Sequence, residues 1–147
     1  MAKSGISLKL KGFDKLLEEI QRANGDIKAA TEQAMNKSVA VVEKELHQHC
    51  DAAGVPSSIS SEIRADRAQW RGNVCEAKVG WKLGAYDPKN PSQGHKAIFL
   101  NYGTPHRKKH GKVKGRFFIG KAKDASEKQV KKIQKQTLEE ILKGLNG

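Results

Sequence analysis

Two short apolar blocks separated by a basic, glycine-punctuated loop constrain the fold of this chain more than any other feature. The first block covers residues 98–102, and the second covers residues 117–119. Gly103 suits a turn that needs a positive φ, and Pro105 keeps the residue before it extended, so the chain has to change direction after the first block. We therefore expect both blocks to be anchored in the core, with the loop 103–116 held out in solvent between them.

The positive charge of the chain is concentrated in and around this loop. The sequence has a formal net charge of +12, and the stretch from residue 89 to residue 123 contains ten Lys and Arg residues and no acidic residue. A field localised in this way indicates a polyanionic neighbour or an acidic protein surface. The residues that we expect to face such a partner lie in the loop: Arg107, Lys108, Lys109, Lys112, Lys114 and Arg116.

The two blocks resemble the motifs of a known family, the small neck proteins of long-tailed bacteriophages, which are called head–tail joining or tail-completion proteins. Members typically carry Phe or Leu, Glu or Asn, Phe or Tyr, then Gly-Thr, and after a loop they carry Arg-Pro-Phe at the start of a last helix. Asn101 stands where an acidic residue is common in the family, and Gly115 and Arg116 precede the second block without the usual proline. The residues that carry the resemblance are Asn101, Tyr102, Gly103, Thr104, Phe117 and Phe118.

The resemblance implies a structural virion protein of a siphophage or prophage neck, made in the host cytoplasm and acting without catalysis. Such a protein completes the tail and joins it to the head connector. We expect it to be part of an oligomeric ring around the DNA channel. Its partners would be the head connector or stopper and the tail terminator or tail tube proteins, and non-specific contact with packaged DNA fits the basic loop.

Hydrophobic periodicity predicts an α+β fold, in which a small antiparallel sheet of three or four strands packs on a long central helix and a C-terminal helix. We expect one domain over residues 1–147, with a flexible tail at 1–5 and loops at 83–95 and 103–116. The predicted strands are 6–11, 64–70 and 74–81, the last two forming a hairpin with its turn at 71–73. The predicted helices are about 13–23, about 27–53 and about 118–145, and residues 97–102 form either a helix or a strand.

Local signals refine this outline. Asp26 is placed to cap the long helix through its carboxylate, and Asn24-Gly25 ends the helix before it. Pro56 starts either one turn of helix or the entry into a strand. In the strand 74–81, alternation places four residues on the core side of the sheet, opposite Glu76 and Lys78: Cys75, Ala77, Val79 and Trp81.

Residues with catalytic or metal-binding chemistry are sparse, so we expect neither an enzyme nor a cofactor. The sequence has no phosphate-binding loop and no nucleophile elbow. His106 and His110 have a spacing that suits zinc only in a helix, and the basic residues around them disfavour a cation. Cys50 and Cys75 are expected to be buried thiols rather than a disulfide or metal pair. No stretch is long and apolar enough to span a membrane, and no signal peptide opens the chain.

A free basic protein that binds duplex nucleic acid without sequence preference is the alternative. The loop has enough cations to contact phosphates and release counterions. However, it contains no aromatic residue between Tyr102 and Phe117 on which bases could stack, and no known nucleic-acid-binding signature is recognisable. The position of the gene, between those of the connector and the tail tube or elsewhere, would separate the two hypotheses.

Overall fold

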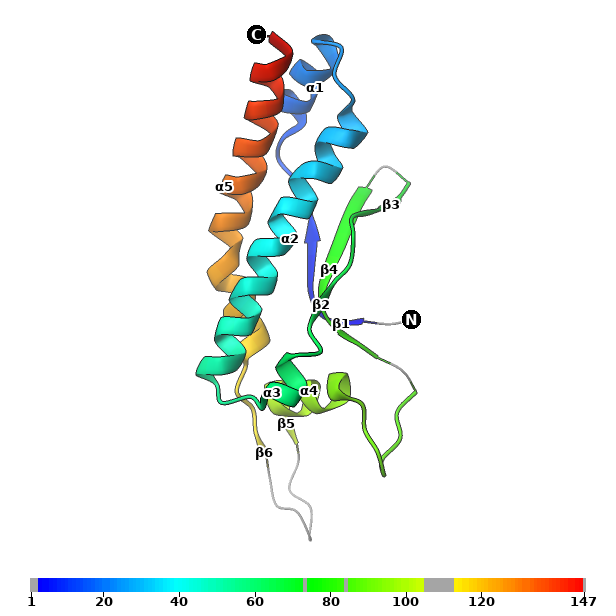
Figure 1. The fold of residues 1–147 in the computed structure, drawn as a ribbon, viewed down its shortest axis with the longest axis vertical. Coiled ribbons are helices and arrows are strands. Elements are labelled where there is room, and N and C mark those ends of the chain that lie inside the picture. The colour runs from blue at the N-terminus through cyan, green and yellow to red at the C-terminus, as the bar shows by residue number, and fades with distance from the viewer. Residues whose placement is uncertain (1–2, 73, 84, 105–112, 147) are drawn as a thin grey trace.

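A computed structural model describes residues 3–72, 74–83, 85–104 and 113–146. Two long helices, α2 and α5, lie side by side and run in opposite directions along the length of the molecule, and a sheet packs beside them (Figure 1). The predicted α+β class is therefore confirmed. In chain order the elements are β1 (Lys3–Lys9), α1 (Asp14–Arg22), α2 (Ile27–Ala52), α3 (Ser57–Ser60), β2 (Arg64–Ala65), β3 (Gln69–Arg71), β4 (Val74–Lys82), α4 (Gln93–Tyr102), β5 (Gly103–Thr104), β6 (Val113–Lys114) and α5 (Phe118–Asn146).

The helix α2 forms the centre of the molecule. It begins as predicted, because the Asp26 carboxylate accepts a hydrogen bond from the Ala29 N–H at 3.2 Å. Its buried side chains include Met35, Val42 and Leu46, at the spacing of one helical face. Across the contact with α5, the Gln134 side-chain amide points at the Met35 sulfur at 3.6 Å. The long pair of helices is thus joined by a packed apolar seam that includes a buried polar contact.

The sheet is organised around β4, which pairs antiparallel with β1 on one side and with β2 and β3 on the other. The predicted core face of β4 is confirmed, because Cys75, Ala77, Val79 and Trp81 are all buried. A continuous strand over 64–70 is wrong. Ala65 pairs with Val79 and Gln69 with Glu76, so four steps along one strand match three along the other, which indicates a bulge.

Side-chain contacts outside the sheet account for this interruption. The Ala68 N–H donates to the Asn36 side chain of α2 at 3.3 Å instead of to β4. The Asp66 N–H still donates to the Lys78 carbonyl at 2.8 Å, so the two short strands remain attached to β4. A hydrogen-bond partner from a helix 32 residues earlier in the chain therefore divides the strand.

The first strand begins earlier than predicted. Residues 3–5 belong to β1 rather than to a loose tail, since Lys3, Ser4 and Gly5 pair with Lys82, Trp81 and Gly80. Gly5 has a φ of 142°, and any Cβ at this position would overlap the Val79 carbonyl oxygen. The strand can approach β4 this closely because residue 5 has no side chain.

Two predicted loops are shorter than expected. The loop 83–95 ends at Ser92, whose hydroxyl accepts a hydrogen bond from the His95 N–H at 3.3 Å and starts α4 at Gln93. Residues 97–102 are therefore helical. Within the expected loop 103–116, β5 and β6 pair antiparallel. Residues 105–112 lie outside the described residues.

Candidate interaction surface at the α4–α5 junction

Asn101 joins the end of α4 to the start of α5. Its side chain is only 2% exposed, and Oδ1 accepts a hydrogen bond from the Ile119 N–H at 2.9 Å. Its carbonyl accepts from the Phe117 N–H at 2.9 Å, and the Leu100 carbonyl accepts from the Arg116 N–H at 2.9 Å. Asn101 thus acts as the N-terminal cap of α5 from another helix, since the first N–H groups of a helix have no partner within it.

The backbone at Phe117 turns two neighbouring aromatic side chains in opposite directions. Phe117 has a φ of 50°, in the left-handed region, and its side chain is 55% exposed. Phe118 is fully buried, and its ring and that of Trp81 form a T-shaped pair at a centroid distance of 6.1 Å. The Trp81 indole N–H donates to the Ile59 carbonyl at 2.8 Å, which fixes the ring against which Phe118 packs. Of the two phenylalanines expected to be anchors, Phe118 is buried in the core and Phe117 is not.

Arg116 makes contacts within the fold that the sequence did not indicate. Its guanidinium donates from Nη1 to the carbonyls of Ala53 and Gly54, each at 3.1 Å. These carbonyls follow the last turn of α2, where the helix dipole favours a cation. Although Arg116 is exposed, its charge is engaged in holding the end of α2 against the junction. The expectation that Arg116 also faces a partner stays a prediction.

The residues around Asn101 and Arg116 leave two aromatic side chains in solvent. Tyr102 is 65% exposed and the other apolar residues of the first block are only partly buried, so the expectation that this block is anchored in the core is wrong at Tyr102 and holds only in part for the rest. Gly115 lies so close to the end of α4 that a Cβ there would be 2.9 Å from the Tyr102 carbonyl carbon and oxygen. Lys114 is exposed beside it in sequence. We call the exposed side chains of Tyr102, Lys114 and Phe117 the junction surface.

Of the other residues expected at this site, some lie in the described part of the chain and some lie outside it. Gly103 forms the C-cap of α4 at a φ of 84° and opens β5, in which Thr104 follows. This placement needs glycine, as the sequence indicated. Arg107, Lys108, Lys109 and Lys112 lie outside the described residues, as do His106 and His110.

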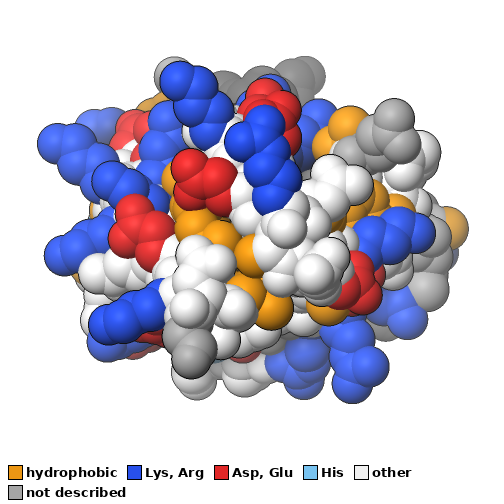
Figure 2. Space-filling model, turned by 90° about the horizontal axis from the view of Figure 1, so that it is seen from above, with side chains coloured by type: hydrophobic (Ala, Val, Ile, Leu, Met, Phe, Trp, Pro, Cys, Tyr) orange, Lys and Arg blue, Asp and Glu red, His pale blue; other side chains and the backbone are white. Residues whose placement is uncertain are grey.

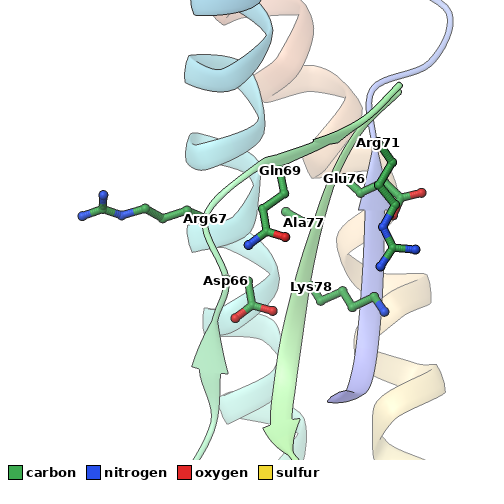
Figure 3. Close-up of a pocket in the computed structure, with 7 residues that line it drawn as sticks. All are labelled: Asp66, Arg67, Gln69, Arg71, Glu76, Ala77 and Lys78. Carbon is green, nitrogen blue, oxygen red and sulfur yellow. The ribbon is translucent and has the colours of Figure 1, made fainter. Parts of the chain in front are cut away.

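A small cavity lies on the face of the sheet that points away from the helices (Figure 3). Its volume is about 110 Å³, and it is lined by charged and polar side chains of β3, β4 and the segment before β3. Glu76 forms ion pairs here with Arg71 at 3.8 Å and with Lys9 at 3.4 Å. The lining consists of charged side chains together with Gln69 and Ala77, and it includes no hydroxyl, thiol or imidazole.

The two cysteines are buried free thiols, as predicted. Burial and then the Asp51 carboxylate raise the pKa of Cys50 to about 12. Burial and then Glu32 raise the pKa of Cys75. Both thiols therefore stay protonated and unreactive near neutral pH. Within the described ranges, no group of three His, Cys, Asp or Glu side chains is placed to hold a metal ion.

Positive charge is also present far from the junction surface. Seen from the end of the molecule that holds α1 and the last turns of α5, Lys and Arg side chains, with acidic ones among them, surround a central hydrophobic area (Figure 2).

No helix in the described part of the chain is long and apolar enough to cross a membrane. No family model, curated protein or solved structure matches the chain.

Proposed function

We propose that this protein is a structural subunit of the neck of a long-tailed phage or prophage, which completes the tail and joins it to the head connector. The observation that carries this proposal is the junction surface. Tyr102 and Phe117 are exposed at positions that Asn101, Arg116 and the buried Phe118 hold in place. Exposed aromatic side chains on a fixed scaffold are typical of protein–protein interfaces.

The backbone at Phe117 supports an interface function for this side chain. A left-handed conformation costs a residue with a side chain roughly 1–2 kcal/mol. Here that conformation turns Phe118 into the core and leaves Phe117 in solvent. Burial of an aromatic ring in a subunit interface stabilises it by about 1.5–3 kcal/mol, so the exposed ring is a source of binding energy.

The mechanism that follows is assembly without chemistry. Neighbouring subunits or the adjoining ring would bury Tyr102 and Phe117, while the basic residues of the loop meet an acidic protein surface or the phosphates in the channel. Charged groups at such a rim mainly set orientation and association rate. A ring supplies a high local concentration of partners, so each contact can be weak alone.

The test changes the junction surface without changing the core. Tyr102→Ser and Phe117→Ser are combined in the phage that carries the gene, and particles are examined by electron microscopy. We expect DNA-filled heads separated from tails, because the apolar contacts of the interface are lost. The matched control is Val74→Ser with Leu145→Ser, two other exposed apolar side chains, which should leave particles joined. Normal particles from the first variant would overturn the proposal.

Non-specific binding of duplex nucleic acid is the second candidate, and the exposed Lys114 at the base of a loop with four further cations favours it. Lys108, Lys109, Lys112 and Lys114 are therefore changed together to Glu. A neck subunit should stay folded and give unjoined particles or particles that lose DNA. Normal assembly by this variant, together with tight DNA binding by the isolated wild-type protein, would favour the second candidate.

A further inference from the structure

A groove runs between β1 and α5, away from the junction surface. Its volume is about 280 Å³. Side chains of Ile6, Leu8 and Val130, which belong to the hydrophobic core, reach its wall. The sheet is narrow, which leaves room for the groove. Its central strand β4 lies against α2, and α5 contacts the sheet at β1 and extends past the edge of that strand. The space beside β1 is thus bounded by a strand edge and a helix.

The strand β1 is an edge strand within the described residues. All seven of its residues pair with β4 on one side, and no other described strand pairs with it on the opposite side. Along such an edge, alternate residues direct their N–H and C=O groups outward, and these groups can form a ladder with an added strand. A peptide bound in this way gains affinity from the backbone and specificity from alternate side chains.

The charges around the groove favour an added strand with acidic side chains. The side chains of Lys9, Lys11, Lys123 and Lys131 lie along it, with Glu127 as the one carboxylate among its lining residues. Lys9 shares the Glu76 carboxylate of the sheet, whereas the other three are exposed at the rim. A second copy of β1 would bring Lys9 of its own into this basic setting, and lysine on an edge strand opposes such self-pairing. An acidic strand is attracted instead.

We propose that an extended acidic segment of a partner protein binds in this groove by adding a strand to the free edge of β1. The segment would be about seven residues long, to match β1, with small apolar side chains alternating with Glu or Asp. The apolar side chains would face Leu8 and Val130, and the carboxylates would reach the lysines at the rim. This surface is distinct from the junction surface, and the proposal does not depend on the neck function.

The experiment measures binding of a labelled seven-residue peptide, with Glu and Val alternating, to the isolated full-length protein by fluorescence anisotropy. The variant Lys11→Glu, Lys123→Glu, Lys131→Glu should weaken binding at least tenfold. The control variant Lys37→Glu, Lys44→Glu, Lys89→Glu changes the net charge equally at exposed positions outside the groove, and it should weaken binding much less. Equal weakening by the two variants, or no binding to wild type, would overturn the proposal.

Backbone pairing is tested with two N-methylated forms of the same peptide. In an added strand every second N–H faces β1, so methylation of one alternate set should abolish binding while methylation of the other set has little effect. Purely electrostatic binding would treat both forms alike and would contradict strand addition. Hydrogen exchange provides the protein-side readout, because the peptide should protect alternate amides of residues 5–9 and leave β2 unchanged. A chain that dimerises through β1 and ignores the peptide would likewise overturn the proposal.

Discussion

Asn101 shows how one side chain can define the start of a helix that is distant in sequence. Its amide presents an oxygen acceptor, as a carboxylate in the same place would. In the structure that acceptor caps α5 from the end of α4. An aspartate at this position would keep the oxygen acceptor and add a negative charge.

Asn101→Ala should lower the free energy of unfolding by about 1–3 kcal/mol, because the Ile119 N–H loses its acceptor in a buried site. Asn101→Asp should lose less at pH 7, since a carboxylate accepts the same hydrogen bond and is favoured at a helix N-terminus. Urea unfolding of both variants measures this, with Asn90→Ala in the exposed loop as the control. Equal losses from Ala and Asp would show that the oxygen acceptor is not what stabilises the junction.

The raised pKa of Cys50 makes stability depend on pH in the alkaline range. The unfolded chain ionises this thiol near about pH 8.5, whereas the folded chain holds its pKa at about 12. The stabilisation is complete below the unfolded pKa and is lost as the pH rises toward the folded pKa. Between pH 8 and pH 10.5 the unfolding free energy of the wild type should therefore fall more than that of Cys50→Ala. Parallel profiles for the two proteins would contradict this.

At the scale of elements, the end of α2 and the start of α5 are fixed by neighbouring residues of the α4–α5 junction. Arg116 donates to the Ala53 and Gly54 carbonyls just after α2, and Phe118 begins α5 by packing on Trp81 of β4. The junction thus connects both long helices and the sheet within three residues of chain. A side chain of the junction that points into the molecule stabilises the fold, whereas one that points outward remains available to a partner.

Phe118→Ala should lower the unfolding free energy by about 3–5 kcal/mol, since truncation of a buried Phe leaves a cavity. Phe117→Ala should change it by less than about 0.5 kcal/mol, because its exposed side chain contributes little to the core. Thermal and urea unfolding of the two single variants compare adjacent residues of the same type. Similar losses for both would mean that Phe117 is also packed in solution.

At the scale of the whole molecule, the net charge of +12 raises the question of whether the isolated protein binds DNA. Each phosphate contact contributes roughly −0.9 to the slope of log affinity against log salt concentration, so a binder that uses five or six cations gives a slope near −5. Under the neck proposal the isolated protein should bind duplex DNA weakly, with a shallower slope and no sequence preference. Anisotropy titrations over a salt series measure this, and a steep slope with tight binding would favour the second candidate.

Much of the fold was predictable because its signals are local. The apolar stripe of α2, the Asp26 cap and the alternation in β4 each depend on residues within a few positions of one another, and the structure confirms all three. The start of α4 at Gln93 was missed although its cap, Ser92, is also local. Gly94 and the prolines around it favoured a loop, and close packing against Trp81 and Leu83 instead requires a glycine in that helix.

The candidate site was predictable in position and only partly in detail. The sequence marked Asn101, Gly103 and Phe118 as structural residues of the turn, but it gave no sign of the contacts that Arg116 makes within the fold. No local signal reveals that its guanidinium meets carbonyls 62 and 63 residues earlier. The exposure of Tyr102 was also unexpected, because an aromatic residue in an apolar block reads as part of the core until its direction is known.

The sequence by itself determined the two long helices, the core face of the central strand and the concentration of positive charge, because periodicity, capping and composition are properties of the chain alone. Only the tertiary structure decided that β1 begins at Lys3, that Asn36 divides the strand before β4, and that Arg116 belongs to the end of α2. It also decided which of two adjacent phenylalanines is buried. Each of these outcomes depends on a contact with a residue that is distant in the sequence. Hydrogen bonds and close packing form between groups that are near in space, wherever those groups lie in the chain.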